Sequence, residues 1–228
     1  MKTYACSDLH GHKNLYDQIR QFIQPDDVVY FLGDAGDRGP QSWETIKAIA
    51  SDPNFIYLKG NHEDMLANAM HEQIVYDMPD YWTRALISNG GEDTINDWLA
   101  DNSNREWINH LFGLDDYVVY TTKDGKTIFL THAGFTPEHN KELPREDILI
   151  WDRQHINDKW NDGFDNVYVV HGHTPIQNFK NFNGEIEPLV YCGGHKICID
   201  AGTYVSKAAI LLDLDTFESH VFKIKEDN

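Results

Sequence analysis

Metal-type side chains follow five separate strand-like segments of this sequence. Each segment is a short run rich in Val, Ile, Phe or Tyr and bounded by Gly, Pro or Asp, which is typical of a buried strand. Ligands in open α/β sheets bind beyond the carboxyl ends of the strands. The residues found there carry carboxylate, carboxamide or imidazole groups: Asp8, His10, Asp34, Asn61, His62, His132, His171 and His173. Five such positions in one chain indicate a single polynuclear metal site.

The spacing of these residues indicates how the donors would be shared between ions. Asp8 and His10 are two residues apart on an extended backbone, so their side chains point to the same side and can bind one cation. Asp34 ends the neighbouring strand, and its two carboxylate oxygens can bridge two cations. The donors left for a second ion are Asn61, His132 and His173. Mixed nitrogen and oxygen donors suit Mn, Fe, Zn, Co or Ni rather than Ca, so we expect two divalent transition-metal ions per chain, with manganese as the first candidate.

Taken singly, these residues have structural alternatives. Asn61 can cap the helix that follows it, with Asp64 in the position of a capping box. His132 and His173 can be structural histidines with ordinary hydrogen-bond partners. Their joint occurrence at successive strand ends favours the metal site, and a cap role for Asn61 is compatible with it.

The segments that must position these donors form an α/β pattern. Strand and helix signals alternate over residues 1–70, which predicts parallel strands joined by right-handed crossovers. Strand signals dominate the second half, and Asp124-Gly125 between two of them indicates a hairpin. We therefore expect one domain over residues 1–228, with two mixed β-sheets packed face to face and helices on the outside.

Three segments depart from this pattern. Residues 71–115 are polar and helical in pattern, so we expect a helical insertion that either borders the substrate groove or serves as structural cover. Residues 133–166 and 178–188 are rich in Asn, Gly and Pro, which predicts loops. The rim of the substrate site would come from these three segments.

Charge and cysteine content restrict the partners and the compartment. Nineteen basic and 37 acidic residues leave a formal charge of −18, which repels nucleic acids and anionic membranes at long range. The sequence contains no signal-peptide core and no run near the ~18 apolar residues of a membrane span. Its three cysteines, Cys6, Cys192 and Cys198, form no Cys-x-x-Cys pair and predict no disulfide framework. We expect a cytoplasmic location and no nucleic-acid or membrane partner, and the sequence indicates no oligomeric state.

Five motifs occur in the same order as in a known protein family. They are Ser7-Asp8-Leu9-His10-Gly11, Gly33-Asp34-Ala35-Gly36-Asp37-Arg38-Gly39, Gly60-Asn61-His62-Glu63, His132-Ala133-Gly134 and Gly172-His173-Thr174-Pro175. This series resembles the signature motifs of the phosphoprotein phosphatase (PPP) family of calcineurin-like metallophosphoesterases, although Ser7 stands where that family often has Gly. Two further segments resemble its bacterial and phage-type branch: Asn89-Gly90-Gly91 and Ile199-Asp200-Ala201-Gly202.

The resemblance implies a dinuclear metal site and assigns its ligands. One metal would be bound by Asp8, His10 and Asp34. The other would be bound by Asp34, Asn61, His132 and His173. His171 precedes the matching position and would lie behind the ligands.

The expected mechanism is direct, in-line attack on phosphorus by a hydroxide that bridges the two cations. His62 would protonate the departing alkoxide as general acid, and Asp37 would orient His62. Arg38 supplies a planar fork of donors for phosphate oxygens. Arg153 is the candidate for a second phosphate-binding arginine, with a surface ion pair as its alternative, and Tyr204 would approach the site after the last core strand.

The expected substrate is phosphorylated, and the leading activity is that of a phosphomonoesterase similar to bacterial Ser/Thr protein phosphatases. The alternative is a symmetrical dinucleoside polyphosphate hydrolase acting on diadenosine tetraphosphate, which needs the same metals and differs only at the rim. A catalytically silent metal-binding scaffold is the third reading, and the presence of His62, Asp37 and Arg38 argues against it. The histidines outside the motifs are expected to be surface or structural residues: His12, His71, His110, His139, His155, His195 and His220.

Overall fold

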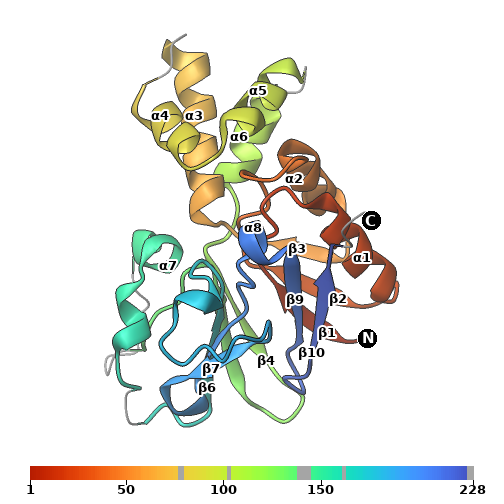
Figure 1. The fold of residues 1–228 in the computed structure, drawn as a ribbon, viewed down its shortest axis with the longest axis vertical. Helices are drawn as coiled ribbons and strands as arrows, with labels where there is room; N and C mark the ends of the chain where they lie inside the picture. Colours follow the sequence, from red (N-terminus) through yellow and green to blue (C-terminus); the bar gives the residue numbers. More distant parts are fainter. Residues whose placement is uncertain (77–79, 102–103, 138–144, 161–162, 225–228) are drawn as a thin grey trace.

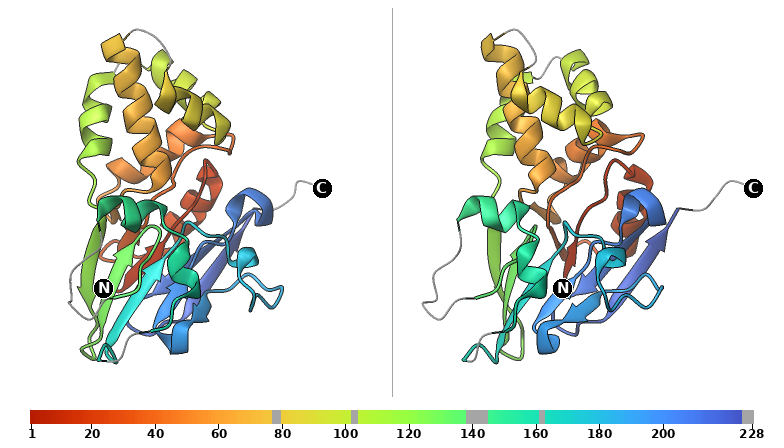
Figure 2. Two further views of the ribbon diagram at one scale, coloured as in Figure 1. Left: turned by 90° about the vertical axis from the view of Figure 1, so that its left-hand side faces the viewer. Right: turned by 60° about the vertical axis from the view of Figure 1, so that its left-hand side comes forward.

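Two five-stranded sheets packed face to face form the centre of the molecule (Figures 1 and 2). The computed structural model describes residues 1–76, 80–101, 104–137, 145–160 and 163–224. Both sheets combine parallel and antiparallel neighbours, and helices lie on their outer sides. The α/β fold with two mixed sheets that the sequence predicts is therefore confirmed. Within the described ranges, no helix combines the length and apolar character needed to cross a bilayer.

The first sheet carries the alternating strands and helices of the N-terminal part. Its strands, in spatial order, are β10 (Ser219–Lys223), β9 (Ala208–Asp213), β1 (Thr3–Cys6), β2 (Val28–Phe31) and β3 (Phe55–Tyr57). β1, β2 and β3 are parallel, as expected for strands joined by helical crossovers, whereas β9 runs antiparallel to β1. The carboxyl ends of the three parallel strands therefore meet at one edge of the sheet.

The second sheet is built from the strand-rich second half of the chain. Its strands, in spatial order, are β4 (Tyr117–Thr121), β5 (Thr127–Thr131), β6 (Val167–His171), β8 (Lys196–Cys198) and β7 (Leu189–Tyr191). β4 and β5 form the expected hairpin, and Gly125 in its turn adopts a φ of +87°, which glycine tolerates best. β5, β6 and β8 are parallel, so their carboxyl ends also meet at one edge.

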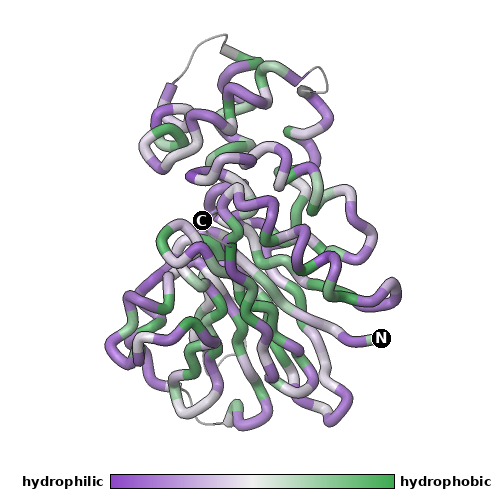
Figure 3. Tube along the Cα trace, turned by 45° about the vertical axis from the view of Figure 1, so that its right-hand side comes forward, coloured by the Kyte–Doolittle hydropathy of each residue, from purple (hydrophilic) through white to green (hydrophobic). Residues whose placement is uncertain are grey.

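Side chains alternate along the strands and divide the core into layers. In β1, Ala5 packs in one cluster with Leu130 and Val170 of the second sheet, whereas Tyr4 and Cys6 pack against helices on the other side. The trace coloured by hydropathy shows the apolar stretches following the strands through the centre of the molecule (Figure 3). Because both faces of β1 are covered, the strand is rigid where its end delivers polar residues.

The helices fall into two groups. Those that cover the sheets are α1 (Lys13–Phe22), α2 (Ser42–Ser51), α7 (Glu146–Trp151) and the short α8 (Thr203–Ser206). Those that stand above the sheets in Figure 1 are α3 (Asn61–Tyr76), α4 (Tyr81–Ser88), α5 (Glu92–Ala100) and α6 (Asn104–Phe112). Helices thus occupy most of the segment in which the sequence pattern indicates an insertion.

One expectation about loops is wrong in part. Residues 133–166 contain α7 and a 3₁₀ helix, η1 (Gln154–Asn157), where the sequence predicts only loop. Leu149 and Ile150 of α7 are buried against Phe135 and Val169, so tertiary packing stabilises a helix that is too short to be evident from its sequence. The remaining short helices are η2 (Ile176–Asn178) and η3 (Cys192–Gly194). Parts of the expected insertion and loop lie outside the described residues, and so does His139.

Candidate metal centre and active site

The predicted metal-binding residues meet where the carboxyl ends of the two sheets converge. Asp8 and His10 follow β1, Asp34 follows β2, His132 follows β5 and His173 follows β6, while Asn61 is the first residue of α3. All six side chains are buried, with exposed fractions of 5% or less. Strand ends from both sheets therefore contribute to one enclosed polar cluster.

A first group of donors gathers around one oxygen of Asp34. The Nε2 atom of His10 lies 3.7 Å from Oδ2 of Asp34 and 4.0 Å from Oδ1 of Asp8. The Nε2 atom of His62 lies 3.8 Å from the same Asp34 oxygen. His10, Asp34 and His62 can hold an ion by distance alone, although the sequence predicts Asp8 and not His62 as the third ligand.

A second group gathers around the other oxygen of Asp34. The Nε2 atom of His132 lies 3.3 Å from Oδ1 of Asp34 and 2.9 Å from Oδ1 of Asn61. The Nδ1 atom of His173 lies 2.8 Å from the same Asn61 oxygen and 3.2 Å from Nε2 of His132. The Asn61 side chain thus faces this group, and among the described residues it makes no capping hydrogen bond to its helix. Asp34 belongs to both groups, as a bridging ligand would.

Each of the three predicted ligand histidines has its other ring nitrogen next to a backbone carbonyl. The pairs are His10 Nδ1 with Gly36 O at 3.0 Å, His132 Nδ1 with Leu32 O at 2.6 Å and His173 Nε2 with Trp151 O at 3.2 Å. A carbonyl can only accept, so the proton lies on the outward nitrogen and the inward nitrogen is unprotonated, with a lone pair that can bind a metal. This is the orientation that metal-binding histidines need.

Burial shifts the ionisation of the same residues. It raises the pKa of the Asp8 and Asp34 carboxyls well above the usual range, and repulsion between neighbouring carboxylates adds to the shift. It lowers the pKa of His132 to about 3 because an imidazolium is poorly solvated there. Divalent cations would supply the countercharge that ionised carboxylates need and would bind neutral imidazoles. The donors, their orientation and their burial therefore fit two cations.

The backbone around the cluster is strained. Nine described residues other than glycine have positive φ, and six of them are predicted site residues: Asp8, His10, Asp34, Asp37, Arg38 and His173. Such conformations cost roughly 1–3 kcal/mol each and persist where surrounding contacts impose them. Here the loops brace one another, since the backbone N–H groups of Asp8 and His10 donate to the carbonyls of Gly33 and Asp34 at 3.0 Å. The fold thus fixes the cluster through backbone contacts between loops.

The predicted general acid lies beside its predicted orienting group. Nδ1 of His62 is 2.5 Å from Oδ2 of Asp37, so the ring donates to the carboxylate and turns Nε2 toward the cluster. The other oxygen of Asp37 accepts a hydrogen bond of 2.6 Å from the hydroxyl of Thr94 in α5. A buried carboxylate held on both sides can stabilise an imidazolium, which is the form that donates a proton.

Arg38 reaches the cluster from the loop between β2 and α2. Its Nη1 and Nη2 atoms lie 2.8 Å from Nε2 of His10 and Nε2 of His62, respectively. Its backbone N–H donates to Gly90 O at 2.8 Å, and its Nε donates to Asn89 O at 3.3 Å. The Asn89-Gly90-Gly91 turn after α4 therefore positions the guanidinium.

Arg153 also lies at the cluster. Its Nη2 donates to the carbonyl of His173 at 3.0 Å, and its Nε lies 3.3 Å from the Thr174 hydroxyl. The alternative of a surface ion pair is wrong for the described part of the chain, where no carboxylate pairs with Arg153. Tyr204 lines a cavity of about 190 Å³ together with His10 and Arg38, so it does approach the site.

Sequence reasoning assigned no role to several residues that support the site. Glu63 is buried and accepts from the backbone N–H groups of Asp34, Ala35 and Gly60 at 2.7, 2.9 and 2.9 Å, and from the Tyr57 hydroxyl at 2.7 Å. It therefore fixes the turn that carries the bridging carboxylate. Its position in the motif Gly60-Asn61-His62-Glu63 was the one feature of the sequence that could have indicated this supporting role.

Three more buried groups lie behind the ligands. Asp200, in the second branch-type motif, is buried, and burial raises its pKa to about 7. His155 is buried and not a surface residue, with Nε2 donating to Ala133 O at 2.7 Å. His171 lies behind the cluster as expected, with Nε2 2.8 Å from the Tyr191 hydroxyl. No pattern in the sequence marks His155.

Comparison with known proteins agrees with this geometry. The model of the family described as calcineurin-like phosphoesterase matches residues 1–198. The chain belongs to the calcineurin-like phosphoesterase family. It is therefore a metal-dependent hydrolase, and the resemblance seen in the motifs is confirmed. The family uses a dinuclear metal centre, and the two donor groups that share Asp34 fit one.

The relatives of this chain are named for two different activities, protein phosphatase and dinucleoside tetraphosphatase. Serine/threonine-protein phosphatase 2 of Escherichia coli (strain K12) is 25% identical over 198 residues, which cover 80% of this chain and 84% of that protein. A symmetrical bis(5'-nucleosyl)-tetraphosphatase of Erwinia tasmaniensis is 29% identical over 143 residues, covering 60% of this chain and 46% of that protein. A solved serine/threonine phosphatase from Saccharomyces cerevisiae shares the fold, with a TM-score of 0.62 at 15% identity, covering 100% of this chain and 81% of that one.

Proposed function

We propose that this phosphoesterase is a dinuclear-metal-dependent phosphomonoesterase that removes phosphate from serine and threonine side chains of proteins. The observation that carries the proposal is the position of Asp34 between two groups of inward-facing donors, with Arg38 and His62 beside them. The relative from Escherichia coli, which matches most of the chain, supports this choice of substrate.

The proposed ligands are Asp8, His10 and Asp34 for one cation and Asp34, Asn61, His132 and His173 for the other. Manganese is the proposed metal because the donors mix imidazole nitrogen with oxygen. Two cations held there would supply the nucleophile at neutral pH and offset the charge of the phosphoryl group. The remaining work falls to the protein's own side chains.

Those side chains bind the phosphate and move one proton. Arg38, in the loop after β2, and Arg153, in the segment after α7, both place guanidinium donors at the cluster. They would hold the phosphate oxygens in place. His62 would donate a proton from Nε2 to the leaving alkoxide. Asp37, held by Thr94, would keep the ring in that orientation and stabilise its protonated form.

A second candidate activity is symmetrical hydrolysis of dinucleoside polyphosphates. The bis(5'-nucleosyl)-tetraphosphatase from Erwinia tasmaniensis supports it, and the same metals and acid would serve both reactions. The free thiols of Cys6, Cys192 and Cys198 suit a reducing compartment, so we also propose a cytoplasmic location for either activity.

The deciding experiment compares substrates under one condition. Manganese-loaded protein is incubated with phosphoserine and phosphothreonine peptides and, separately, with diadenosine tetraphosphate, and kcat/KM is measured for each. The proposal expects the higher kcat/KM on the peptides. A higher value on the dinucleotide selects the alternative activity, and no turnover of either substrate contradicts both.

A further inference from the structure

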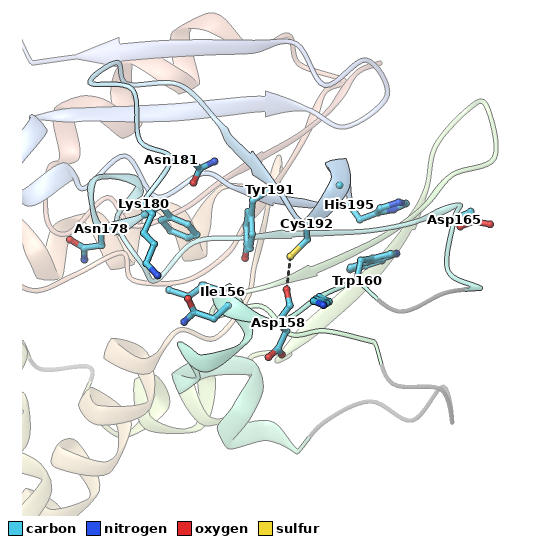
Figure 4. Close-up of a pocket in the computed structure, with 14 residues that line it drawn as sticks. Ile156, Asp158, Trp160, Asp165, Asn178, Lys180, Asn181, Tyr191, Cys192 and His195 are labelled. Atoms are coloured by element: carbon cyan, nitrogen blue, oxygen red, sulfur yellow. Dashed lines mark hydrogen bonds between the residues drawn. The ribbon is translucent and has the colours of Figure 1, made fainter.

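A second cavity lies beside the metal centre and is not used by the proposed reaction. It has a volume of about 840 Å³ and lies between the segment after η1, the segment after η2 and the β7–η3–β8 region (Figure 4). We call it the side groove. Its size is within the about 300–1,000 Å³ of small-molecule sites. Asn178 lines both the side groove and the small cavity that contains His10 and Arg38, so the two cavities are neighbours.

The two ends of the side groove differ in chemistry. At one end, Trp160 and His195 are stacked, with ring centroids 4.7 Å apart and planes only 6° from parallel, and Asp165 lies beyond them (Figure 4). At the other end lie Lys180 and Asn178 (Figure 4). Asn178 also lines the small cavity that contains His10 and Arg38. The groove thus runs from an aromatic, carboxylate-bearing end to a cationic end near the metal centre.

The groove is lined by two lysines, Lys159 and Lys180, and two carboxylates, Asp158 and Asp165. Nine Lys or Arg side chains in the described ranges form ion pairs with carboxylates. Lys159 and Lys180, which line the groove, form none with any described residue. Lys196 is fully buried behind Tyr191 and donates to neutral groups, the hydroxyl of Thr136 and the carbonyl of His155. The charges of Lys159 and Lys180 remain available to an anion in the groove, whereas Lys196 lies behind its lining.

The amide groups of the groove are available as well. Asn157, Asn178 and Asn181 line it, and their side chains make no hydrogen bond to other described residues. A carboxamide offers both donors and an acceptor, which suits the edge of a nitrogen heterocycle. Tyr191 and Phe179, whose ring centroids are 5.2 Å apart, add an apolar wall. The lining therefore combines flat, hydrogen-bonding and cationic elements in one cavity.

We infer that the side groove binds a purine nucleoside phosphate. The base packs on the aromatic walls and is read by the asparagine amides, and the Asp165 carboxylate accepts from ribose hydroxyls. The phosphate lies at the Lys180 end and points toward the metal centre. This site rests on the lining of the groove alone, so it does not depend on the proposed phosphomonoesterase activity. The nucleotide is either one half of a dinucleotide substrate or a separate ligand.

The test is calorimetric titration of the metal-loaded protein with AMP, compared between the original protein and variants of the groove. We expect saturable binding that Lys180→Gln weakens about tenfold, because one charge-assisted hydrogen bond is lost. Adenosine, which lacks the phosphate, should bind Lys180→Gln and the original protein equally. Trp160→Ala should weaken both ligands. The matched control is Lys223→Gln on β10, a lysine without a described ion pair, which should change nothing.

Kinetics distinguish the two sources of the nucleotide. If the groove holds half of a substrate, Lys180→Gln raises KM for diadenosine tetraphosphate about tenfold and leaves KM for phosphopeptides unchanged. If the nucleotide is a separate ligand, both KM values stay constant and AMP changes kcat only in the protein with Lys180. Absence of saturable AMP binding, or equal affinities of the Lys180→Gln and Lys223→Gln variants, overturns the inference. Normal phosphatase activity in that case would leave the proposed function intact.

Discussion

The metal centre and the side groove lie next to each other and hold their polar groups in opposite ways. In the metal centre, buried side chains contact one another directly; Nδ1 of His62, for example, lies 2.5 Å from Oδ2 of Asp37. Six of the site residues also have positive φ. In the groove, Lys159, Lys180 and three asparagines are exposed and make no side-chain contact of this kind within the described chain. The first site is imposed by the fold, whereas the second can adapt to its ligand.

This difference predicts how substitutions act. A side chain of the metal centre is part of a buried network, so its loss leaves neighbouring groups unpaired and changes the chemistry. A side chain of the groove is solvated on its own, so its loss changes affinity and little else. The effects on turnover should therefore fall in size from the bridging carboxylate, through the acid and its support, to Lys196 behind the groove.

The largest effect is expected for Asp34→Asn. The amide cannot bridge two cations as a carboxylate does, so both metal positions should be disturbed together and kcat/KM should fall at least about a thousandfold. Elemental analysis gives the metal content, and Asp17→Asn, which removes an exposed carboxylate paired with Lys13, is the control. Loss of a single ion would contradict the bridging role.

His62→Asn should retain both metals and separate substrates by leaving group. General acids contribute about 10²–10⁴ in rate, so turnover of alkyl phosphates should fall within that range. p-Nitrophenyl phosphate should be affected much less, because its phenolate leaves without a proton. Equal losses on both substrates, or loss of a metal, would instead assign His62 to the donor group that it forms with His10 and Asp34.

Thr94→Val tests whether the helical region supports catalysis. Without the 2.6 Å hydrogen bond to Asp37, the orientation of His62 should loosen, lowering kcat on alkyl phosphates about tenfold without changing KM. Thr83→Val is the matched control, because Thr83 is also buried and its hydroxyl donates to a carboxylate, that of Glu72, at 3.0 Å. Similar kcat values for the two variants would make Thr94 a structural residue only.

The sequence was sufficient to predict which residues meet, because parallel strands deliver their ends to one edge and the motif residues lie at those ends. It was insufficient for contacts made across the fold. Thr94 reaches Asp37 over 57 positions and Arg38 reaches Asn89 over 51, and neither spacing has a periodic signal. The burial of His155 likewise depends on packing of the 154–157 turn, which the sequence suggested was loop.

The smallest effect on turnover is expected at Lys196, which is buried behind Tyr191 of the groove and should act on stability instead. Burial lowers the pKa of Lys196 to about 8, whereas an unfolded lysine titrates near 10.4. Between these values the unfolded chain binds more protons, so the free energy of unfolding should rise as the pH increases from about 8 to 10.4. Cys192, Asp158 and Asp152 are its titratable neighbours and oppose the shift only in part.

Lys196→Met removes this titration while keeping an unbranched side chain in place. Relative to the variant, the original protein should gain up to about 3 kcal/mol between pH 8 and 10.4, as measured by urea unfolding at several pH values. Lys223→Met should show no such pH-dependent difference, because Lys223 lies on an exposed position of β10. A constant difference for Lys196→Met would mean that the buried amine does not change its charge in this range.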